Sequence, residues 1–522
     1  MKQSIVVDYI NKTYGKRVKV SPMYPIIENW RAWLEGNVKG FHSYYQKINL
    51  ASNTKKKLYR HKTNMLLKGS EDWASILLNE KTQIIIEDEP SQRFVMGDDQ
   101  ISGVFGENDF WRCANENIAT SRWSGTAAFE VYVKEMQVTA EETGISGRLI
   151  GGSGIGINYL SADQIIPITF DNGILREVAF VSDRNIGGED LQLVSVHLIV
   201  DGAYEITSFY LDESGKVKNI DGYGVTVRTG SPIPWFSLIR KSGVNIFDYD
   251  SPFGVSIISG NEDVLKGLDY CFDNFITDFK LGRKMVLMAK SMFDTDDEGN
   301  AVSPQEGDAQ LFINAGDKLL NGELYQEYNP SLRVQENSEA LQKMLDMFSF
   351  KIGFGTRHYQ FQGGTIQTAT EYTGEKQDLV QNAAKEMICV EKALKEVTRA
   401  ILWIGRNVLG SNCNPDAKIT IIADDSYIID QDSERKRWQE EIKAGIRQRY
   451  EYRMKFYGET EEEAKRNVKP TIAELLEGKA QGVVSDRELR QYLFPLESDE
   501  DAERALAEIR NNEPTAEQLL GM

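Results

Sequence analysis

Apolar residues recur at helical spacing over residues 1 to about 85, as in Trp30 with Trp33 and again in Trp73 with Leu77. The spacing predicts helices throughout this part of the chain. Between two of them lies a basic stretch, Lys55 to Lys62. We interpret it as a solvated face, and contact with a phosphate or a partner is the alternative.

The hydrophobic period changes to two between about 145 and 235. Runs such as LVSVHLIV (193–200) and AYEITSFYL (203–211) are separated by turn signals such as Asp201-Gly202, which predicts an antiparallel region of hairpins. His197 falls inside one of these strands. No second His or Cys is near it in sequence, which favours a packed or surface histidine over a metal ligand.

Helical spacing returns after residue 254 and becomes regular. The apolar or small residues alternate between steps of three and four along about 25 residues, or about 37 Å of helix. They are Leu265, Leu268, Phe272, Phe275, Phe279, Gly282, Val286 and Ala289. Such a seam fits a buried helix of an ordinary helical domain. It equally fits a helix packed side by side with copies of itself, and the pattern leaves both open.

Downstream of this helix the pattern alternates again before a second helical region. An acidic, turn-rich stretch and two strand-like runs predict a small β-insertion. A helix over 335–352 and a polar loop rich in glycine and glutamine follow, and then a helix over 369–409 that would extend about 60 Å. In the C-terminal part of the chain, the pattern predicts a strand at 419–424 and charged helices from about 432, followed by an acidic tail.

Composition narrows the class of protein. The chain has 522 residues, enough for two or three domains, and a formal charge of −19. That charge argues against a protein that wraps nucleic acid by neutralising phosphates. The cysteines lack CxxC spacing and predict free thiols: Cys113, Cys271, Cys389 and Cys413. No apolar run reaches the roughly 18–20 residues of a membrane span, so we expect a soluble protein made in the cytosol.

Two segments superficially resemble ligand-binding loops. The glycine cluster GGSGIGIN (151–158) lacks the Lys-Ser/Thr of a phosphate loop and precedes a strand, which favours a hairpin or a bulge. Asp294, Asp296 and Glu298 resemble the start of a calcium loop. Its twelfth position is Gln305 instead of glutamate, so we expect an exposed acidic turn.

Enzymatic chemistry has few candidate residues in this sequence. There are four histidines, scattered along the chain, and neither GxSxG nor HExxH occurs. The acidic residues show no spacing that singles out a catalytic pair. We therefore expect a protein that is not an enzyme and that needs no cofactor and no metal.

Two short motifs and the order of the elements resemble one known family. DWASILLNEK (72–81) is similar to an early Trp-Ala-x-x-Leu-Leu-Asn-Glu segment of the portal proteins of tailed bacteriophages, of the type common in phages of Gram-positive hosts. TIQTATEYTGEKQD (365–378) resembles the Thr-Ala-Thr-Glu segment that opens their long helix. The order of elements matches over nearly the whole chain. Residues 88–145 and the acidic tail match no pattern of that family.

The resemblance implies an α+β portal fold with wing, stem, clip and crown. It implies a ring of about twelve subunits at one capsid vertex. The implied parts are 1–255, N-terminal helices and β-rich wing; 256–291, first stem helix; 292–334, clip with the β-insertion; 335–352, second stem helix; 353–368, tunnel loop; 369–430, long wing helix and return strand; and 431–522, helical crown and acidic tail.

The same resemblance implies site residues. The channel or tunnel loop would present Arg357, His358, Gln360, Gln362, Thr365 and Gln367. The stem would pack through Leu265, Leu268, Phe272, Phe275 and Phe279, and the clip would dock partners through Asp296, Asp297 and Glu298. Uncharged polar tunnel residues suit a conduit that must let DNA slide. Contact of Arg357 and His358 with phosphates or with neighbouring subunits remains open.

The implied function is passage of double-stranded DNA during packaging and ejection. The implied partners are the terminase large subunit, a head-completion or adaptor protein, and the major capsid and scaffolding proteins, within the virion and with no membrane. A cytosolic scaffold or adaptor with long helices and no ring is one alternative. An enzyme acting on phosphorylated ligands through 151–158 is another, which the missing Lys-Ser/Thr disfavours.

Overall fold

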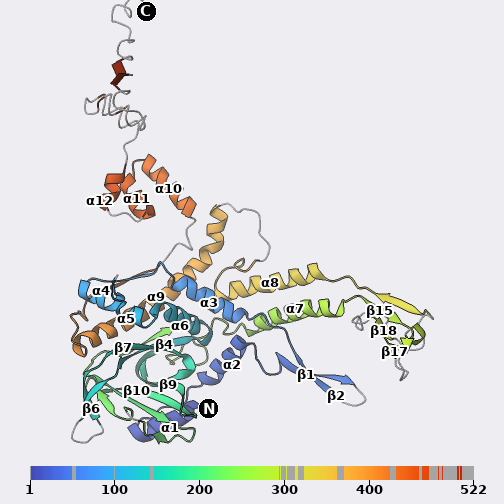
Figure 1. Ribbon diagram of the computed structural model, residues 1–522, viewed down its shortest axis with the longest axis horizontal. Coiled ribbons are helices and arrows are strands. Elements are labelled where there is room, and N and C mark those ends of the chain that lie inside the picture. The colour runs from blue at the N-terminus through green and yellow to red at the C-terminus, as the bar shows by residue number, and fades with distance from the viewer. Residues whose placement is uncertain are drawn as a thin grey trace, which may run out of the picture. The chain divides into compact units, whose positions relative to one another are not determined.

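The computed structural model divides into two compact units, Met1–Ile428 and Ile429–Met522. The described residues are 2–49, 54–98, 100–140, 146–220, 222–292, 294–295, 301–302, 312–314, 323–360, 369–423, 431–457, 461–468, and 480, 485, 489, 503–504 and 506–507. The first unit combines helices with largely antiparallel sheets (Figure 1), which confirms the α+β prediction.

The N-terminal region holds three helices, as predicted, and one hairpin that was not. The helices are α1 (Lys2–Tyr14), α2 (Met23–Glu35) and α3 (Met65–Leu77). The prediction of helix is wrong for the hairpin, in which β1 (Ser43–Asn49) pairs antiparallel with β2 (Thr54–Tyr59). Tyrosines in both strands favour extended backbone. A helix over these residues would be polar on all sides and would have no apolar face to pack.

The described residues of 83–140, most of which the family pattern left unassigned, fold into helices and strands of the first unit. The elements are β3 (Gln83–Ile86), α4 (Glu89–Met96), α5 (Gly103–Glu107), α6 (Phe110–Ser124), β4 (Thr126–Lys134) and β5 (Gln137–Ala140). Asp88 caps α4 by accepting a hydrogen bond from the Ser91 amide at 3.0 Å. β3 pairs with β20 (Ile419–Ile422), the predicted return strand.

The predicted hairpin region is an eight-stranded sheet in the order β5-β6-β13-β11-β10-β9-β8, with β12 paired to β11. Its further strands are β6 (Ser146–Gly151), β8 (Ile165–Asp171), β9 (Ile174–Ile186), β10 (Glu189–Val200), β11 (Ala203–Leu211), β12 (Val217–Lys218) and β13 (Thr226–Arg228). All neighbours pair antiparallel except β13 with β6. Helix α1 covers one face through Val6, Val7 and Ile10.

Two of the predicted turns have the backbone of tight hairpin loops. Asn172-Gly173 joins β8 to β9, and Asp201-Gly202 joins β10 to β11. All four residues have positive φ, between 49° and 81°. Two successive positive φ values are what a type I′ turn requires, and Asn-Gly and Asp-Gly adopt them at little cost.

A second sheet, β14-β4-β7, carries the long helix of the fold. It contains β7 (Gly154–Ser161), preceded by the turn within the glycine cluster, and β14 (Phe236–Arg240); the 3-10 turn η1 (Ala162–Gln164) follows β7. Helix α9 (Ala369–Asn407), predicted over 369–409, packs against β14 and β4. Its apolar stripe is fully buried at Val390, Leu394, Val397 and Ile401.

A buried charge network ties this helix to its surroundings. Arg122 of α6 is fully buried and pairs with Glu386 of α9, while Lys241 Nζ lies 3.7 Å from the same carboxylate. The Ser242 amide donates to Glu386 Oε2 at 3.1 Å. Burial disfavours the ionised carboxyl, but the two cations and the Ser242 hydrogen bonds outweigh it and hold the pKa of Glu386 below its ordinary value.

Two antiparallel helices form an arm that leads to a small sheet (Figure 1). They are α7 (Glu262–Leu281) and α8 (Val334–Ile352), and the sheet has the order β18-β15-β19. Its strands are β15 (Met285–Met288), β18 (Phe312–Asn314) and β19 (Tyr325–Tyr328), with η2 (Lys290–Met292), β16 (Asp294–Thr295) and β17 (Ala301–Val302) nearby in sequence. The predicted insertion and second helix are therefore confirmed.

The prediction of a first stem helix running to residue 291 is wrong. α7 ends at Leu281, and Gly282 follows as its C-cap. The run Met285–Met288 pairs instead with β18 and β19. A glycine lowers the helical preference at this point, and strand pairing on both sides of β15 satisfies its backbone. The last positions of the proposed seam, Gly282, Val286 and Ala289, thus lie outside the helix.

The second unit contains three described helices, as its charged pattern predicted. They are α10 (Gln431–Lys443), α11 (Arg449–Tyr457) and α12 (Glu461–Asn467). Trp438 packs edge-on against Phe456 at 5.7 Å, and the Arg447 guanidinium lies 3.8 Å from the Trp438 ring centroid. Most of the chain after residue 468, including most of the acidic tail, lies outside the described residues.

Candidate functional site

The arm is held together near its far end by a polar cluster between α7 and α8. Asn337 of α8 donates to Asp278 at 2.7 Å and accepts from Asn274 at 2.9 Å. Arg333 donates to Asp278 at 2.6 Å. The hydrogen bonds from Arg333 and Asn337 hold the pKa of Asp278 below its ordinary value. These contacts fix the register of the two helices.

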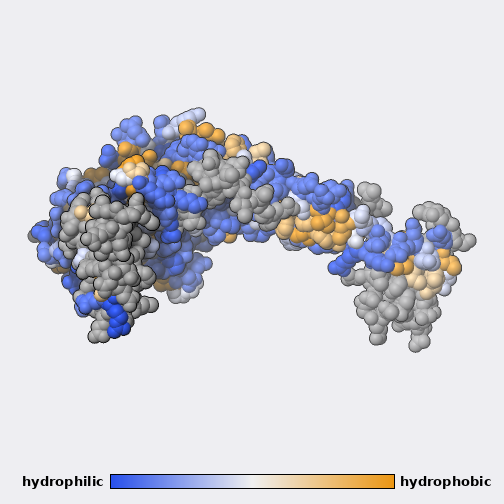
Figure 2. All heavy atoms as spheres, turned by 90° about the horizontal axis from the view of Figure 1, so that it is seen from above, coloured by the Kyte–Doolittle hydropathy of each residue, from blue (hydrophilic) through white to orange (hydrophobic). Residues whose placement is uncertain are grey.

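The apolar seam of α7 is buried at one end only. Leu265 and Leu268 are buried, Phe272 and Phe275 are half-buried, and Phe279 is 46% exposed. Leu281 is 66% exposed. Exposed apolar residues continue on the segment before α8 and along α8, and Figure 2 shows apolar surface along the arm. They are Leu332, Val334, Met347 and Phe350. Exposed apolar residues gathered along one arm mark a candidate interaction surface.

The clip residues proposed from the resemblance, Asp296, Asp297 and Glu298, lie outside the described residues. So do most positions of the calcium-like pattern. The neighbouring strand β19 exposes Tyr325 and Tyr328, and Leu324, just before this strand, is exposed as well. Lys284 and Glu327 form an exposed ion pair at 2.6 Å beside this sheet.

The segment after α8 is anchored at its start. Gly353 has a φ of 94° and ends the helix. The Trp73 indole donates to the Ile352 carbonyl at 3.1 Å, and its ring stacks on Phe354 with centroids 4.8 Å apart. Trp73 belongs to the DWASILLNEK motif, so one role of this motif is to hold the end of α8.

Three of the proposed tunnel residues, Arg357, His358 and Gln360, lie in this anchored segment. His358 is half-buried and stacks on Phe354 at 4.3 Å, whereas Arg357 and Gln360 are exposed. The other three proposed tunnel residues, Gln362, Thr365 and Gln367, lie outside the described residues.

Tyr359 ties the same segment to both α3 and α8. Its hydroxyl donates to Asp72 at 2.7 Å, and the Gln342 amide donates to its backbone carbonyl at 2.8 Å. Burial first, and then the hydrogen bond to the Asp72 carboxylate, raise the pKa of Tyr359, so the hydroxyl stays protonated. Exposed polar groups at 357 and 360 are therefore presented from a fixed base.

The base of the arm is joined to the β1–β2 hairpin by two aspartates of α7. Asp269 accepts hydrogen bonds from the Thr63 amide at 2.7 Å and from the Thr63 hydroxyl at 2.8 Å. Asp273 accepts from the His61 amide at 3.0 Å. The Arg60 guanidinium lies over the rings of Phe41 at 4.2 Å and Tyr270 at 4.3 Å. The interpretation of a solvated face is therefore wrong for Arg60 and His61, which are partly covered.

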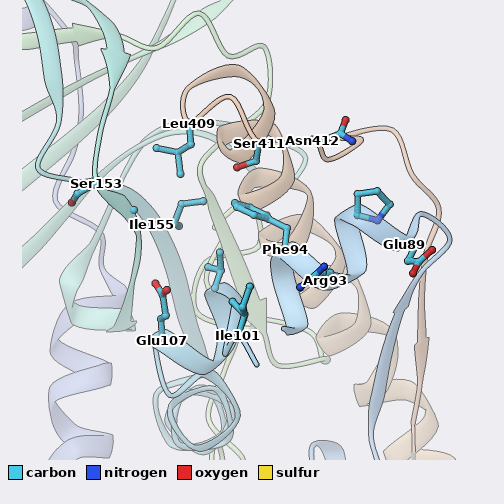
Figure 3. A pocket seen from close by; sticks show the side chains of 14 residues that line it. Glu89, Arg93, Phe94, Ile101, Glu107, Ser153, Ile155, Leu409, Ser411 and Asn412 are labelled. Carbon is cyan, nitrogen blue, oxygen red and sulfur yellow. The ribbon is translucent and has the colours of Figure 1, made fainter. Parts of the chain in front are cut away.

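A cavity of about 520 Å³ lies where the glycine cluster meets α4, α5 and the end of α9 (Figure 3). Its wall is apolar at Phe94, Ile101, Val104, Ile155 and Leu409, with Glu89 and Glu107 also lining it. Its one arginine, Arg93, pairs with Asp98 at 2.5 Å. Carboxylates in the lining repel phosphate, so the cavity gives no support to a phosphate-binding site at 151–158.

His197 is a buried histidine, in agreement with the sequence. Its Nε2 lies 3.0 Å from Glu130 Oε1 and 3.3 Å from the Ser195 hydroxyl. Among the described residues, no group of three or more His, Cys, Asp or Glu is placed to hold a metal ion. None of the helices in the described part of the chain has the length and apolar character needed to cross a bilayer. All four cysteines are free thiols.

Several contacts at these surfaces were not predicted from the sequence. Asp269 and Asp273 sit four residues apart on α7, a helical spacing that places both on one face. Their partners lie more than 200 residues earlier, and no local signal identifies them. Asp72 with Tyr359 and Glu386 with Arg122 are also more than 200 residues apart, and no local signal identifies these pairs either.

Comparison with known proteins gives little by sequence. No protein-family model matches the chain, and no curated protein matches it. Among solved structures, a chain from the neck of a native GTA particle, computed with C12 symmetry, is a distant structural neighbour. The identity is 13% and the TM-score 0.33, over 75% of this chain and 88% of that one. A TM-score this low does not establish a shared fold.

Proposed function

We propose that this chain is a portal protein of a tailed phage. It forms a closed ring of about twelve copies around a channel for double-stranded DNA, at one vertex of the capsid. The observation that carries the proposal is the arm, two antiparallel helices whose outer end bears a small sheet and whose apolar seam stays half-exposed in one chain. Copies packed side by side would bury that seam.

The order of elements around the arm supports the same role. The anchored segment 353–360 leads from α8 toward the long helix α9, in the order that the portal resemblance implies. Its fixed base and its exposed Gln360 and Arg357 suit a surface along which DNA slides, because few cations means weak phosphate binding. In this proposal the terminase supplies the energy for packaging, and the terminase and the head-completion proteins dock on the clip. We propose a structural and not a catalytic role for the chain itself.

Negative-stain class averages of the purified full-length protein test the ring. The proposal expects closed rings with a central hole. Monomers or two-fold dimers at every concentration tested would contradict it and favour the adaptor with long helices and no ring.

Passage of DNA is tested separately in phage particles assembled with variant protein. Gln360→Glu together with Arg357→Glu should lower the amount of packaged DNA while rings still assemble. Lys12→Glu with Lys19→Gln is the matched control: it makes the same change in net charge at two exposed lysines on or near α1, far from α8 in the sequence. Equal DNA content in the two sets of particles would contradict a channel role for 357–360.

A further inference from the structure

The β1–β2 hairpin reverses the charge of the chain locally. Residues 36–70 contain eight Lys or Arg and no Asp or Glu, which leaves −27 on the rest of a chain whose total is −19. Lys47 pairs directly with Lys55 across the strands. Like charges placed opposite each other destabilise a hairpin, and an isolated two-stranded hairpin is marginal in water.

One face of the hairpin collects these charges together with exposed aromatic rings. Alternation along the paired strands places Tyr45, Lys47, Lys55, Lys57 and Tyr59 on that face. Tyr45 is 68% and Tyr59 69% exposed, and the lysines are exposed as well. None of the three lysines forms an ion pair with an acid of the described chain. The lysines gather toward the turn, and the tyrosines lie nearer the base.

We propose that this face docks on the outer side of helix α8 of a second copy of this chain. The contact requires self-association, and to that extent it rests on the proposed function. The base of the hairpin is fixed to α7 of its own chain through Asp269 and Asp273. In Figure 1 the hairpin and α8 lie on opposite sides of α7, so the α8 within reach is a neighbour's.

Helix α8 carries the complementary stripe. Glu336, Glu339, Met347 and Phe350 are exposed and lie at steps of three, eight and three, on one side of the helix. The two glutamates form no ion pair with a cation among the described residues. From Glu339 to Phe350 the stripe spans about 16 Å. The hairpin face from Lys55 to Tyr59 spans about 13 Å. The two lengths are similar, so the lysines can face the glutamates while the tyrosines face the apolar residues of the stripe.

Protein fits this surface better than nucleic acid does. The hairpin face presents the exposed rings of Tyr45 and Tyr59 beside its lysines. Apolar area of this kind has no counterpart on a phosphate backbone, and the charge of −19 repels DNA at long range. Because the hairpin and α8 are different patches, the contact is head-to-tail, and its repetition gives a closed ring or an open chain.

Sedimentation velocity of full-length variants over a concentration series tests the proposal. Lys47→Glu with Lys55→Glu and Lys57→Glu should weaken self-association about tenfold or more, because attraction becomes repulsion at the contact. Lys12→Glu with Lys19→Glu and Lys216→Glu is the control, with the same change in net charge at three exposed lysines elsewhere. It should associate like the wild-type protein.

A charge swap sharpens the test. Glu336→Lys with Glu339→Lys should weaken association as the hairpin variant does, and combining both sets should restore it to within a few fold of wild type. Unchanged thermal midpoints confirm folding, since every substituted side chain is exposed. Additive loss in the combined variant would overturn the pairing of hairpin with α8.

Other outcomes separate this proposal from the ring. Rings formed normally by the hairpin variant would overturn the docking contact and leave the portal proposal standing. Open chains of wild-type protein that the hairpin variant breaks would support the contact and contradict the closed ring. Normal association with lost binding of a short double-stranded DNA would overturn the contact and assign the hairpin to nucleic acid.

Discussion

Helices α9 and α7 have the same kind of apolar stripe, and they use it differently. In α9 the stripe through Val390, Val397 and Ile401 is fully buried against β14 and β4. In α7 the stripe is buried at Leu265 and Leu268, and then opens to solvent at Phe279 and Leu281. A heptad-like pattern therefore predicts that a helix face is buried, but it does not tell whether the same chain or another copy buries it.

The buried charge network of α9 should give the largest effect. Glu386→Ala leaves Arg122 charged, fully buried and without its carboxylate, which should lower the free energy of unfolding by about 3–5 kcal/mol. Thermal unfolding measures this. Lys418→Met, which breaks the exposed pair of Lys418 with Glu87, is the control and should cost under about 1 kcal/mol. Equal shifts in the two variants would contradict a special role for the buried network.

The second-largest effect is expected from truncating one side chain in each stripe, because the α9 and α7 variants should differ in their loss of stability. Ile401→Ala in α9 removes fully buried methyl groups and should cost about 2–4 kcal/mol in thermal unfolding. Leu281→Ala in α7 should change the stability of dissociated protein by less than about 0.5 kcal/mol, yet weaken self-association. A large loss of stability in the dissociated Leu281 variant would show that α7 is covered within its own chain.

The pH dependence of unfolding should follow the same contrast. The pKa of Glu386 is below its ordinary value in the folded protein, so its stabilisation is present above the ordinary carboxyl pKa of about 4.3 and is lost as pH falls through the lowered pKa. Glu386→Gln should flatten the loss of stability on acidification. Asp278→Asn on the arm should flatten it less, because the partner Arg333 is mostly exposed. Denaturant titrations across acid pH compare the slopes.

A modest loss of stability is expected at the anchored segment. Tyr359→Phe removes the hydrogen bond to Asp72 and should cost about 0.5–1.5 kcal/mol. Hydrogen exchange of 353–360 should rise while that of α9 stays unchanged. Unaltered exchange would mean that Trp73 and Phe354 hold the segment without the tyrosine.

Sequence patterns predicted the elements whose signals are local. The hairpins at Asn172-Gly173 and Asp201-Gly202, the helix over 335–352 and the long helix α9 all follow from turn residues or apolar spacing. Where two structures compete for the same residues, the pattern failed. Residues 285–288 continue a helical spacing but find strand partners at 312–314 and 325–328, and only the tertiary fold decides between them.

The candidate site was predictable to a smaller extent. Half-exposure of the α7 seam agrees with the interpretation in which copies of the helix pack together. The anchors at Asp72, Asp269 and Asp273 pair with residues more than 200 positions away. No periodicity encodes such pairs, because each is fixed by the packing of whole elements.

Hydrogen exchange of the full-length protein at low and high concentration tests the central contrast most directly. If the open half of the α7 seam is an interface between copies, amides of residues 275–281 become more protected as concentration rises, while those of α9 from 390 to 401 stay equally protected. Identical protection of residues 275–281 at all concentrations, in samples that do self-associate, would contradict the assignment of the arm to assembly.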